Sequence, residues 1–419
     1  MTAAAIRAPT SVGLYLAGVQ FLFALGWIVY VIYLPALAQQ AGLPKAAVPW
    51  LLLMDQLVFV VCDLAVGLWA DRAARVLGKV GLWVLGTTLV SAALFLALPF
   101  IAPQGSPGLF VAITALWAAT SSALRAPPLT LLGRYVAKPS LPWMASLMLL
   151  GTGIAAALGP YLGLTLKGLD PRGPFVLSAL ALAAVTAGMV LAERALARQR
   201  AVDGAIVGAV PGAAVGAAAA AGAAAAQRES AVRPIPGFLL AALLAAAAAQ
   251  LHANVLSAPL YLRHAPASDL PLLMPVFWAG FNLALMPASL AVRRWGALPV
   301  MAAGTLVAAA ASAVAAGAGS LPLLLVAQGL AGAAWGAALM SGFSAAVFFG
   351  HVGREGFMGG ALNAALAGAA FSRIALVTFV APAPALFANA WGWVPGLVFA
   401  LAAALLWAIW SRAGVRGVV

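Results

Sequence analysis

The sequence predicts an all-α membrane protein whose helices each cross a bilayer. Of the 419 residues, 65% are hydrophobic and only 7% are charged, and the mean hydropathy is +1.07. A soluble domain carries about 25% charged residues. The apolar residues also fall into stretches of about 20, the length that a helix needs to span the hydrocarbon core. These observations exclude a water-soluble fold.

Twelve such stretches follow one another along the chain. They cover residues 11–37, 48–70, 79–101, 108–132, 141–167, 173–192, 235–262, 270–292, 298–318, 320–349, 357–382 and 390–411. The connections between them are short except for residues 193–234, which separate the first six spans from the last six. We therefore expect an N-terminal bundle at 1–192, a linker at 193–234 and a C-terminal bundle at 235–419.

The basic residues set the expected orientation. Sixteen of the 22 Lys and Arg fall on one side of the spans, four on the other, and two, Arg125 and Arg373, lie inside them. Loops rich in Lys and Arg stay in the cytoplasm, so both termini and the linker are expected on that side of a bacterial inner membrane. The net charge of +13 then reflects topology, and no nucleic-acid partner is expected.

The linker contains one further apolar stretch, residues 205–226, made almost entirely of Ala, Gly and Val. A thirteenth span here would put the arginines at 194–200 on the opposite side from Arg228 and Arg233, and would invert every later loop. A cytoplasmic linker, partly helical or resting on the membrane surface, is the better interpretation.

A charged motif closes the second span, where Gly67 is followed by Asp71, Arg72 and Arg75. This spacing resembles the loop between helices 2 and 3 of the major facilitator superfamily. The resemblance implies a fold of two six-helix bundles related by a pseudo-two-fold axis. It also implies that the charges of Asp71, Arg72 and Arg75 hold the N-terminal half against helix 11 at the cytoplasmic face and release it when the transporter changes state.

Two pairs of glycines support an internal repeat. Gly133 and Gly151 are 18 residues apart in the first half, and Gly350 and Gly368 have the same separation in the second half. Both pairs begin at an expected cytoplasmic helix end and continue into the next span. This is the arrangement expected of parallel six-helix repeats.

The fifth span combines small residues with a proline at Gly151, Gly159, Pro160 and Gly163. These residues resemble the helix 5 signature of the drug:proton antiporters in the same superfamily, although Ala155 and Leu164 stand where that signature has glycine. Small residues let two helix backbones approach closely, and the proline would bend the helix where helix 8 crosses it. Gly and Pro are also frequent in membrane helices without any such role.

Two buried charges lie at matching depth near the expected cytoplasmic side. Asp63 precedes Asp71 by 8 residues, and Arg125 precedes Arg134 by 9, which places both at roughly 12 Å from the helix ends. The resemblance puts helices 2 and 4 in one bundle, so an ion pair would satisfy both groups. By the same resemblance, Asp63 and Arg125 couple transport to protons. A brace at the kink made by Pro127 is the alternative for Arg125, since proline frees a backbone carbonyl.

The other two charges match at the outer side. Asp55 lies roughly 24 Å from the cytoplasmic end of its span, and Arg373 roughly 27 Å. Because helices 2 and 11 face each other in the superfamily, Asp55 and Arg373 are predicted to form a gate between the halves. The alternative is that Arg373 is free to anchor an anionic substrate.

The resemblance also implies that helices 1, 4, 7 and 10 line a substrate cavity. The polar and aromatic residues of these spans that share helix faces are Gln20, Trp27, Tyr30, Gln250, Asn254, Gln328 and Trp335. His252 points away from Gln250 and Asn254, because two residues correspond to about 200° on a helix. Such a lining suits a small amphipathic molecule, but packing would explain the aromatic residues equally well.

No catalytic signature is present in the sequence. There is no phosphate-binding loop, no cluster of metal ligands and no nucleophile beside a histidine and an acid, so neither an enzyme nor a cofactor or metal site is expected. We predict a monomeric secondary transporter that moves a small amphipathic molecule and protons across the lipid bilayer, in the direction of efflux. The alternatives are a transporter of a small organic anion bound by the intramembrane arginines, and a membrane sensor or scaffold that does not transport.

Overall fold

The computed structural model describes residues 10–76, 81–125, 127–136, 140–208, 234–350, 354–380 and 391–412. Within these residues, twelve helical segments are long and apolar enough to cross a membrane. The predicted fold class is confirmed. Most of the expected linker, residues 209–233, lies outside the described residues.

The first six spans are built from eight helices. These are α1 (Thr10–Gln40), α2 (Val48–Val76), α3 (Gly81–Ile101), α4 (Pro107–Ser121), α5 (Pro127–Tyr135), α6 (Leu141–Thr165), α7 (Arg172–Thr186) and α8 (Met189–Gly208). The fourth span is divided into α4, a 3-10 turn at Ser122–Leu124 and α5. Pro127 and Pro128 explain the division, because neither residue can donate the backbone hydrogen bond that a continuous helix requires.

The last six spans follow the same plan. They comprise α10 (Ile235–Leu251), a π-helical turn (His252–Leu256), α11 (Ser257–Tyr261), α12 (Leu270–Leu273), α13 (Pro275–Trp295), α14 (Ala297–Ala316), α15 (Leu321–Phe349), α16 (Glu355–Phe379) and α17 (Val394–Arg412). Gly296 alone separates α13 from α14. Its φ of 88° is available to glycine and to few other residues, so the chain reverses there in one step.

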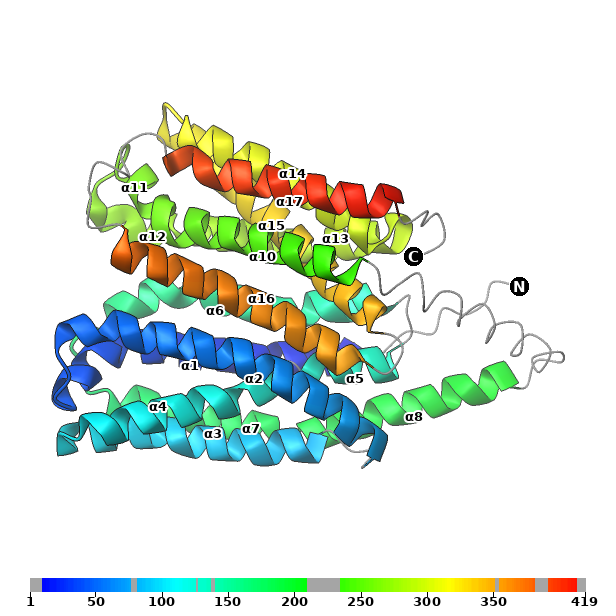
Figure 1. Ribbon diagram of the computed structural model, residues 1–419, viewed down its shortest axis with the longest axis horizontal. Helices are drawn as coiled ribbons and strands as arrows, with labels where there is room; N and C mark the ends of the chain where they lie inside the picture. The colour runs from blue at the N-terminus through cyan, green and yellow to red at the C-terminus, as the bar shows by residue number, and fades with distance from the viewer. Residues whose placement is uncertain are drawn as a thin grey trace.

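The helices form two halves that lie side by side (Figure 1). The helices α1 to α8 of the N-terminal half, coloured from blue to green, occupy one side of the bundle, and the helices α10 to α17 of the C-terminal half, coloured from brighter green to red, occupy the other. Among the described helices, the most extensive contacts between the halves are those of α2 with α16 and of α6 with α13. The second and fifth spans thus meet their expected partners, the eleventh and the eighth.

One end of the bundle, called the basic end below, is where α2, α13 and α17 finish, and it carries Arg72, Arg293, Arg294 and Arg412 near these helix ends. The helix α8 projects beyond its neighbours at this end (Figure 1). It continues to Gly208, whereas the predicted bundle stops at residue 192. Its Glu193 is buried and accepts a hydrogen bond from the backbone N–H of Gly81 at 2.8 Å. The first turns of the expected linker are therefore part of the N-terminal bundle.

Glycines allow the helix backbones of the two halves to come into direct contact. Gly67 of α2 lies against the carbonyl oxygen of Gly356 in α16, and Gly360 of α16 lies against the carbonyl oxygen of Asp63. A Cβ atom at either glycine would overlap backbone. In a membrane, where lipid is as apolar as a leucine side chain, close backbone packing of this kind is a main source of helix association.

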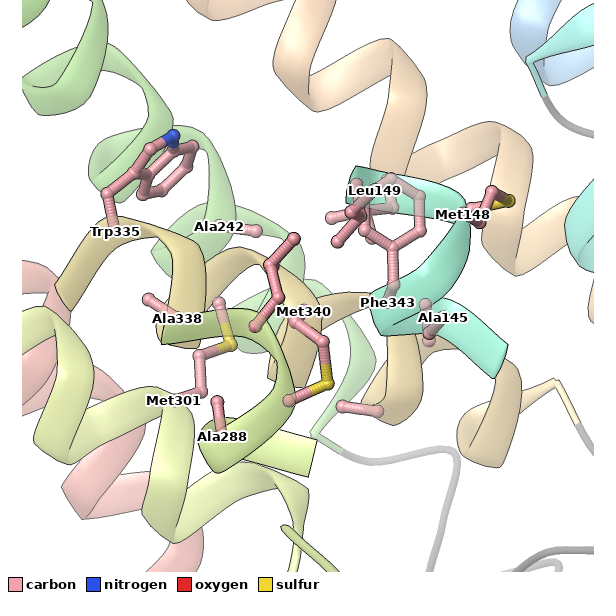
Figure 2. Close-up of a cluster of buried hydrophobic side chains, with 14 of the residues drawn as sticks. Ala145, Met148, Leu149, Ala242, Ala288, Met301, Trp335, Ala338, Met340 and Phe343 are labelled. Carbon is pink, nitrogen blue, oxygen red and sulfur yellow. The ribbon is translucent and has the colours of Figure 1, made fainter. Parts of the chain in front are cut away.

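A large apolar cluster fills the rest of the interface and reaches into both halves. Figure 2 shows Leu149 of α6 beside Phe343 of α15, and Met301 and Met340 further into the C-terminal half. Trp335 lies on the far side of this cluster from Leu149. The two halves are therefore joined by apolar packing around a small number of buried polar groups, which are described next.

Candidate functional site

Two opposite charges meet inside the membrane-spanning region. Nε of Arg125 lies 3.0 Å from a carboxylate oxygen of Asp63, whose side chain is 0% exposed. The predicted contact is present. Neither oxygen of Asp63 accepts a hydrogen bond of good geometry among the described residues, so the attraction is chiefly between the two charges. Each charge depends on the other, because an unpaired charge in this setting is costly.

Arg125 also reaches the other half of the molecule. Its guanidinium stacks over the ring of Phe59 at 4.4 Å from the ring centroid and donates to the carbonyl oxygen of Asn363 in α16 at 3.4 Å. In return, the amide of Asn363 donates to the carbonyl oxygen of Arg125 at 3.3 Å. The ion pair therefore sits at the junction of α2, the divided fourth span and α16.

The carbonyls beside Pro127 and Pro128 are held by amides and not by the guanidinium of Arg125. Nε2 of Gln20 donates to the carbonyl oxygen of Leu124 at 2.8 Å, and Nδ2 of Asn363 donates to the carbonyl oxygen of Arg125. Gln20 thus supports the break in the fourth span from α1, a role distinct from the predicted cavity lining. Asn363 was not predicted, although an asparagine in a span otherwise rich in Ala and Gly was a usable signal.

Asp71 joins the halves at the basic end. Its two carboxylate oxygens accept the backbone N–H groups of Gly356 and Phe357, at 2.7 and 2.8 Å. These N–H groups are at the start of α16, where they lack partners within the helix and where the helix dipole favours a negative charge. Of the two arginines predicted beside it, Arg72 is exposed, and the side chain of Arg75 lies outside the described residues.

The predicted ion pair between Asp55 and Arg373 is not formed in this conformation. Asp55 is 0% exposed and accepts a hydrogen bond from the hydroxyl of Tyr30 at 2.7 Å. The bond is made by Oδ2, so one carboxylate oxygen is held within the N-terminal half, while Oδ1 is buried and has no hydrogen-bond partner among the described residues. Arg373 has no ion pair or hydrogen bond within the described residues, and its buried Nε is unpartnered. The gating role of this pair stays a prediction.

The aromatic residues expected to line a cavity pack among other aromatic rings. Trp27 stacks on Trp117 with 5.9 Å between ring centroids, and Tyr30 lies 4.6 Å from Trp117. In the C-terminal half, Trp335 packs against Phe399 at 6.4 Å. Tyr30 is fully buried and Trp335 nearly so, which favours the packing interpretation for both residues.

The polar residues of the seventh and tenth spans divide into two groups. Asn254 donates to Gln250 at 2.9 Å, as expected of residues on one helix face. Gln328 instead lies 3.0 Å from Nε2 of His252, and both side chains are buried. The sequence placed His252 on a different face from Gln250 and Asn254, but it did not identify Gln328 as its partner.

The glycines of the fifth span contribute unequally. Gly151 lies against the carbonyl oxygen of Ala17 in α1, and Gly153 lies against Asn282 in α13. Space beside Gly159 is bounded only by Ile28, and no atom lies within 4 Å of a Cβ placed on Gly163. Close packing of α6 therefore depends on its first two glycines. Pro160 follows within the same helix.

No group of three metal-ligating side chains occurs among the residues for which side-chain positions are described. Several of the buried polar groups form an ion pair or hydrogen-bonded pairs at helix contacts, whereas Arg373 does not. Two six-helix halves that meet at a few buried charged groups are an architecture found in many secondary transporters.

Comparison with known proteins shows what this chain is similar to. The family model described as Major Facilitator Superfamily matches residues 16–202. A bacterial homologue of the iron transporter ferroportin, in an outward-facing state, has a similar structure, with a TM-score of 0.71, 15% identity, and coverage of 96% of this chain and 100% of that chain. No curated protein sequence matches this chain.

Two further solved structures share the fold. The human organic anion transporter TETRAN has a TM-score of 0.68 at 13% identity, covering 96% of this chain and 100% of its own. The transporter FucP, in the outward conformation, has a TM-score of 0.61 at 15% identity, covering 95% and 98%. The family model covers less than half of the chain, and these solved structures, all at 15% identity or less, show that the whole chain shares the fold of major facilitator superfamily transporters.

Proposed function

We propose that this protein is a proton-coupled secondary transporter that exports a small amphipathic molecule by alternating access. The observation that supports this proposal most is the ion pair between Asp63 and Arg125. It is buried, it can be neutralised by one proton, and the guanidinium that it holds also touches Asn363 in the opposite half. Protonation of Asp63 would therefore remove the counter-charge of Arg125, which contacts the opposite half at the interface that must open during transport.

The coupling follows from the energetics of buried charge. While Asp63 is ionised, Arg125 is compensated and can remain in the packed interface. A proton on Asp63 leaves the guanidinium without its counter-charge, which is strongly unfavourable in a dry site. Protonation therefore favours a conformation in which water reaches Arg125, and loss of the proton favours closure again. This reciprocal dependence is what links proton binding to a conformational change.

Closure at the basic end is assigned to α2 and α16. Asp71 caps the first turn of α16, and Gly67 and Gly360 allow the two backbones to touch. Both contacts must break for this end to open, because α2 and α16 belong to different halves. Arg72 and Arg75 would stabilise the same end through their charge.

The substrate class is proposed from the residues and not from the structural neighbours. The names of those neighbours mention iron, organic anions and, for another, xylose, so the shared fold does not choose among them. The amides of the half-buried Gln250 and the exposed Asn254, and the partly buried Trp27, offer hydrogen bonds and an aromatic face to an amphipathic molecule. We expect a monomer, since each chain contains both halves of the pathway.

The decisive experiment is Asp63→Asn in proteoliposomes. This variant should lose transport driven by a proton gradient but keep exchange of substrate down its own gradient. The matched control is Asp170→Asn, because Asp170 is exposed at the far end and accepts only a local hydrogen bond from the N–H of Arg172. Concentration of substrate against its gradient by Asp63→Asn would refute the coupling role.

The orientation is testable separately. We propose that the basic end and both termini face the cytoplasm of a bacterial inner membrane. With the native Cys62 replaced by alanine, a cysteine at the exposed Gln104 should react with an impermeant reagent added to intact cells, and one at Ser411 should not. The opposite pattern would invert the topology.

A further inference from the structure

Arg373 carries a permanent charge inside a membrane span, and nothing in the described chain compensates it. Its span, α16, runs from Glu355 to Phe379. Among the residues that the structure describes, the guanidinium has no hydrogen-bond or ion-pair partner, and its Nε is buried. Arg125, the other arginine inside a span, is paired with Asp63. An unpaired buried charge is unfavourable, so its presence calls for a partner or a purpose.

The acids whose side chains the structure describes do not supply the partner. Asp63 is held by Arg125, Asp71 caps α16, and Asp55 accepts from Tyr30. Glu193 is held at the basic end by the N–H of Gly81. Glu355 precedes Arg373 by 18 residues on the same helix, roughly 27 Å away. Asp170 lies in an exposed loop and Asp269 in a 3-10 turn, both at the end opposite the basic end.

The position of Arg373 on α16 points it to the interior. It follows Leu366 by seven residues, which places the two side chains on nearly the same helix face. Leu366 packs against the apolar cluster that both halves share. Ser372, which is about 100° away on the helix, is exposed. Arg373 therefore faces the region between the halves, and its side chain is partly and not fully buried.

Arg373 is also separate from the coupling pair. It lies ten residues beyond Asn363, which contacts Arg125, and this corresponds to roughly 15 Å along the helix. A ligand held at Arg373 would thus sit closer to the end opposite the basic end. The guanidinium would be free to bind it without disturbing the ion pair between Asp63 and Arg125.

We propose that Arg373 binds the carboxylate of an amphipathic organic anion, and that this anion is the transported substrate. This inference rests on the proposed transport function and names its substrate class. The planar guanidinium presents parallel N–H donors that match the two oxygens of a carboxylate. The neighbouring apolar cluster would accommodate the hydrocarbon part of the same molecule. The ligand would then provide the counter-charge that the chain lacks.

The test is binding to the purified full-length protein in detergent, with no gradient. The probes are benzoate, salicylate and 2-naphthoate, each compared with its uncharged amide, and the readout is the temperature of thermal unfolding. At least one carboxylate should raise the unfolding temperature of the wild type while its amide does not. Arg373→Gln should weaken that carboxylate at least tenfold, and Arg373→Lys should weaken it less.

The control variant is Arg263→Gln. Arg263 is a cation at the end opposite the basic end, but it already donates to the carbonyl oxygen of Ala316 at 3.1 Å. This variant should bind the carboxylate as the wild type does. Without ligand, Arg373→Gln should unfold at the same temperature as the wild type or higher, since it removes an uncompensated charge. A lower temperature would reveal a native partner and overturn the proposal.

The proposal is also overturned if no carboxylate stabilises the wild type more than its amide does, or if Arg373→Gln binds as tightly as the wild type. These outcomes do not depend on proton coupling, because binding in detergent requires no gradient. Conversely, Asp63→Asn should still bind the carboxylate. If Asp63→Asn binds the carboxylate but does not concentrate substrate, anion binding at Arg373 and proton coupling by Asp63 are tested separately, and either proposal can fail without the other.

Discussion

Gly67 of α2 lies so close to the carbonyl oxygen of Gly356 in α16 that a single added methyl group would overlap it. The two residues belong to different halves and meet at the basic end. The contact exists only while that end is closed, because α2 and α16 must separate for it to open. A small change at Gly67 should therefore act on one conformation and leave the other nearly unaffected.

The first prediction is that Gly67→Ala shifts the protein towards a conformation open at the basic end. Overpacking of a close contact costs about 1–3 kcal/mol, which corresponds to roughly a 5- to 150-fold change in the equilibrium. Spin labels at the exposed Leu68 and Arg354 should show a larger share of long distances. Gly163→Ala is the matched control, because no atom lies within 4 Å of the added Cβ. An unchanged distance distribution in Gly67→Ala would rule out this contact as a closure point.

The second prediction concerns Asp71. Asp71→Ala removes the acceptor for the N–H groups of Gly356 and Phe357. Loss of a capping carboxylate costs about 1–2 kcal/mol, and hydrogen exchange at these two amides should accelerate roughly 5- to 30-fold. The control is Glu355→Gln, which alters the first turn of α16 but keeps both hydrogen bonds from Asp71. Equal acceleration in the two variants would show that local charge, and not the cap between halves, protects this turn.

Depth in the membrane was predictable from the sequence because each helical residue advances by a fixed 1.5 Å. Counting residues from Asp71 and Arg134 placed Asp63 and Arg125 at one level, and the two are in contact. The twelve spans followed in the same way, from apolar length alone. The division of the fourth span was signalled by Pro127 and Pro128, since proline cannot continue the hydrogen-bonding pattern.

Rotation of a helix about its own axis was not predictable in this way. Asp55 and Arg373 have matching depth, yet Asp55 turns to Tyr30 within its own half. A residue count cannot decide between these partners, because the choice depends on which neighbour each helix face meets. Gln328 was assigned to a cavity for the same reason, and it contacts the buried His252 instead. The π-helical turn that begins at His252 also changes the helical periodicity on which such assignments rely.

The last prediction concerns that pair. His252 and Gln328 are the buried polar partners that join the seventh span to α15, and Nδ1 of His252 and Nε2 of Gln328 have no partner among the described residues. Gln328→Leu alone should leave a ring nitrogen of His252 unpaired and cost about 1–3 kcal/mol of stability. His252→Leu should cost a similar amount by exposing the amide of Gln328 to apolar surroundings.

The double variant should be more stable than the sum of the two single effects predicts. When both partners are replaced by apolar groups of similar size, no polar atom remains unsatisfied, and the net loss can be small. The measurement is a double-mutant cycle on thermal unfolding in detergent, and the coupling energy should favour the native pair by at least about 0.5 kcal/mol. Ser312→Ala serves as the control, because this buried hydroxyl also lacks a partner but touches neither residue's hydrogen bond. Strict additivity would mean that the 3.0 Å contact contributes nothing, and that His252 and Gln328 are each tolerated independently.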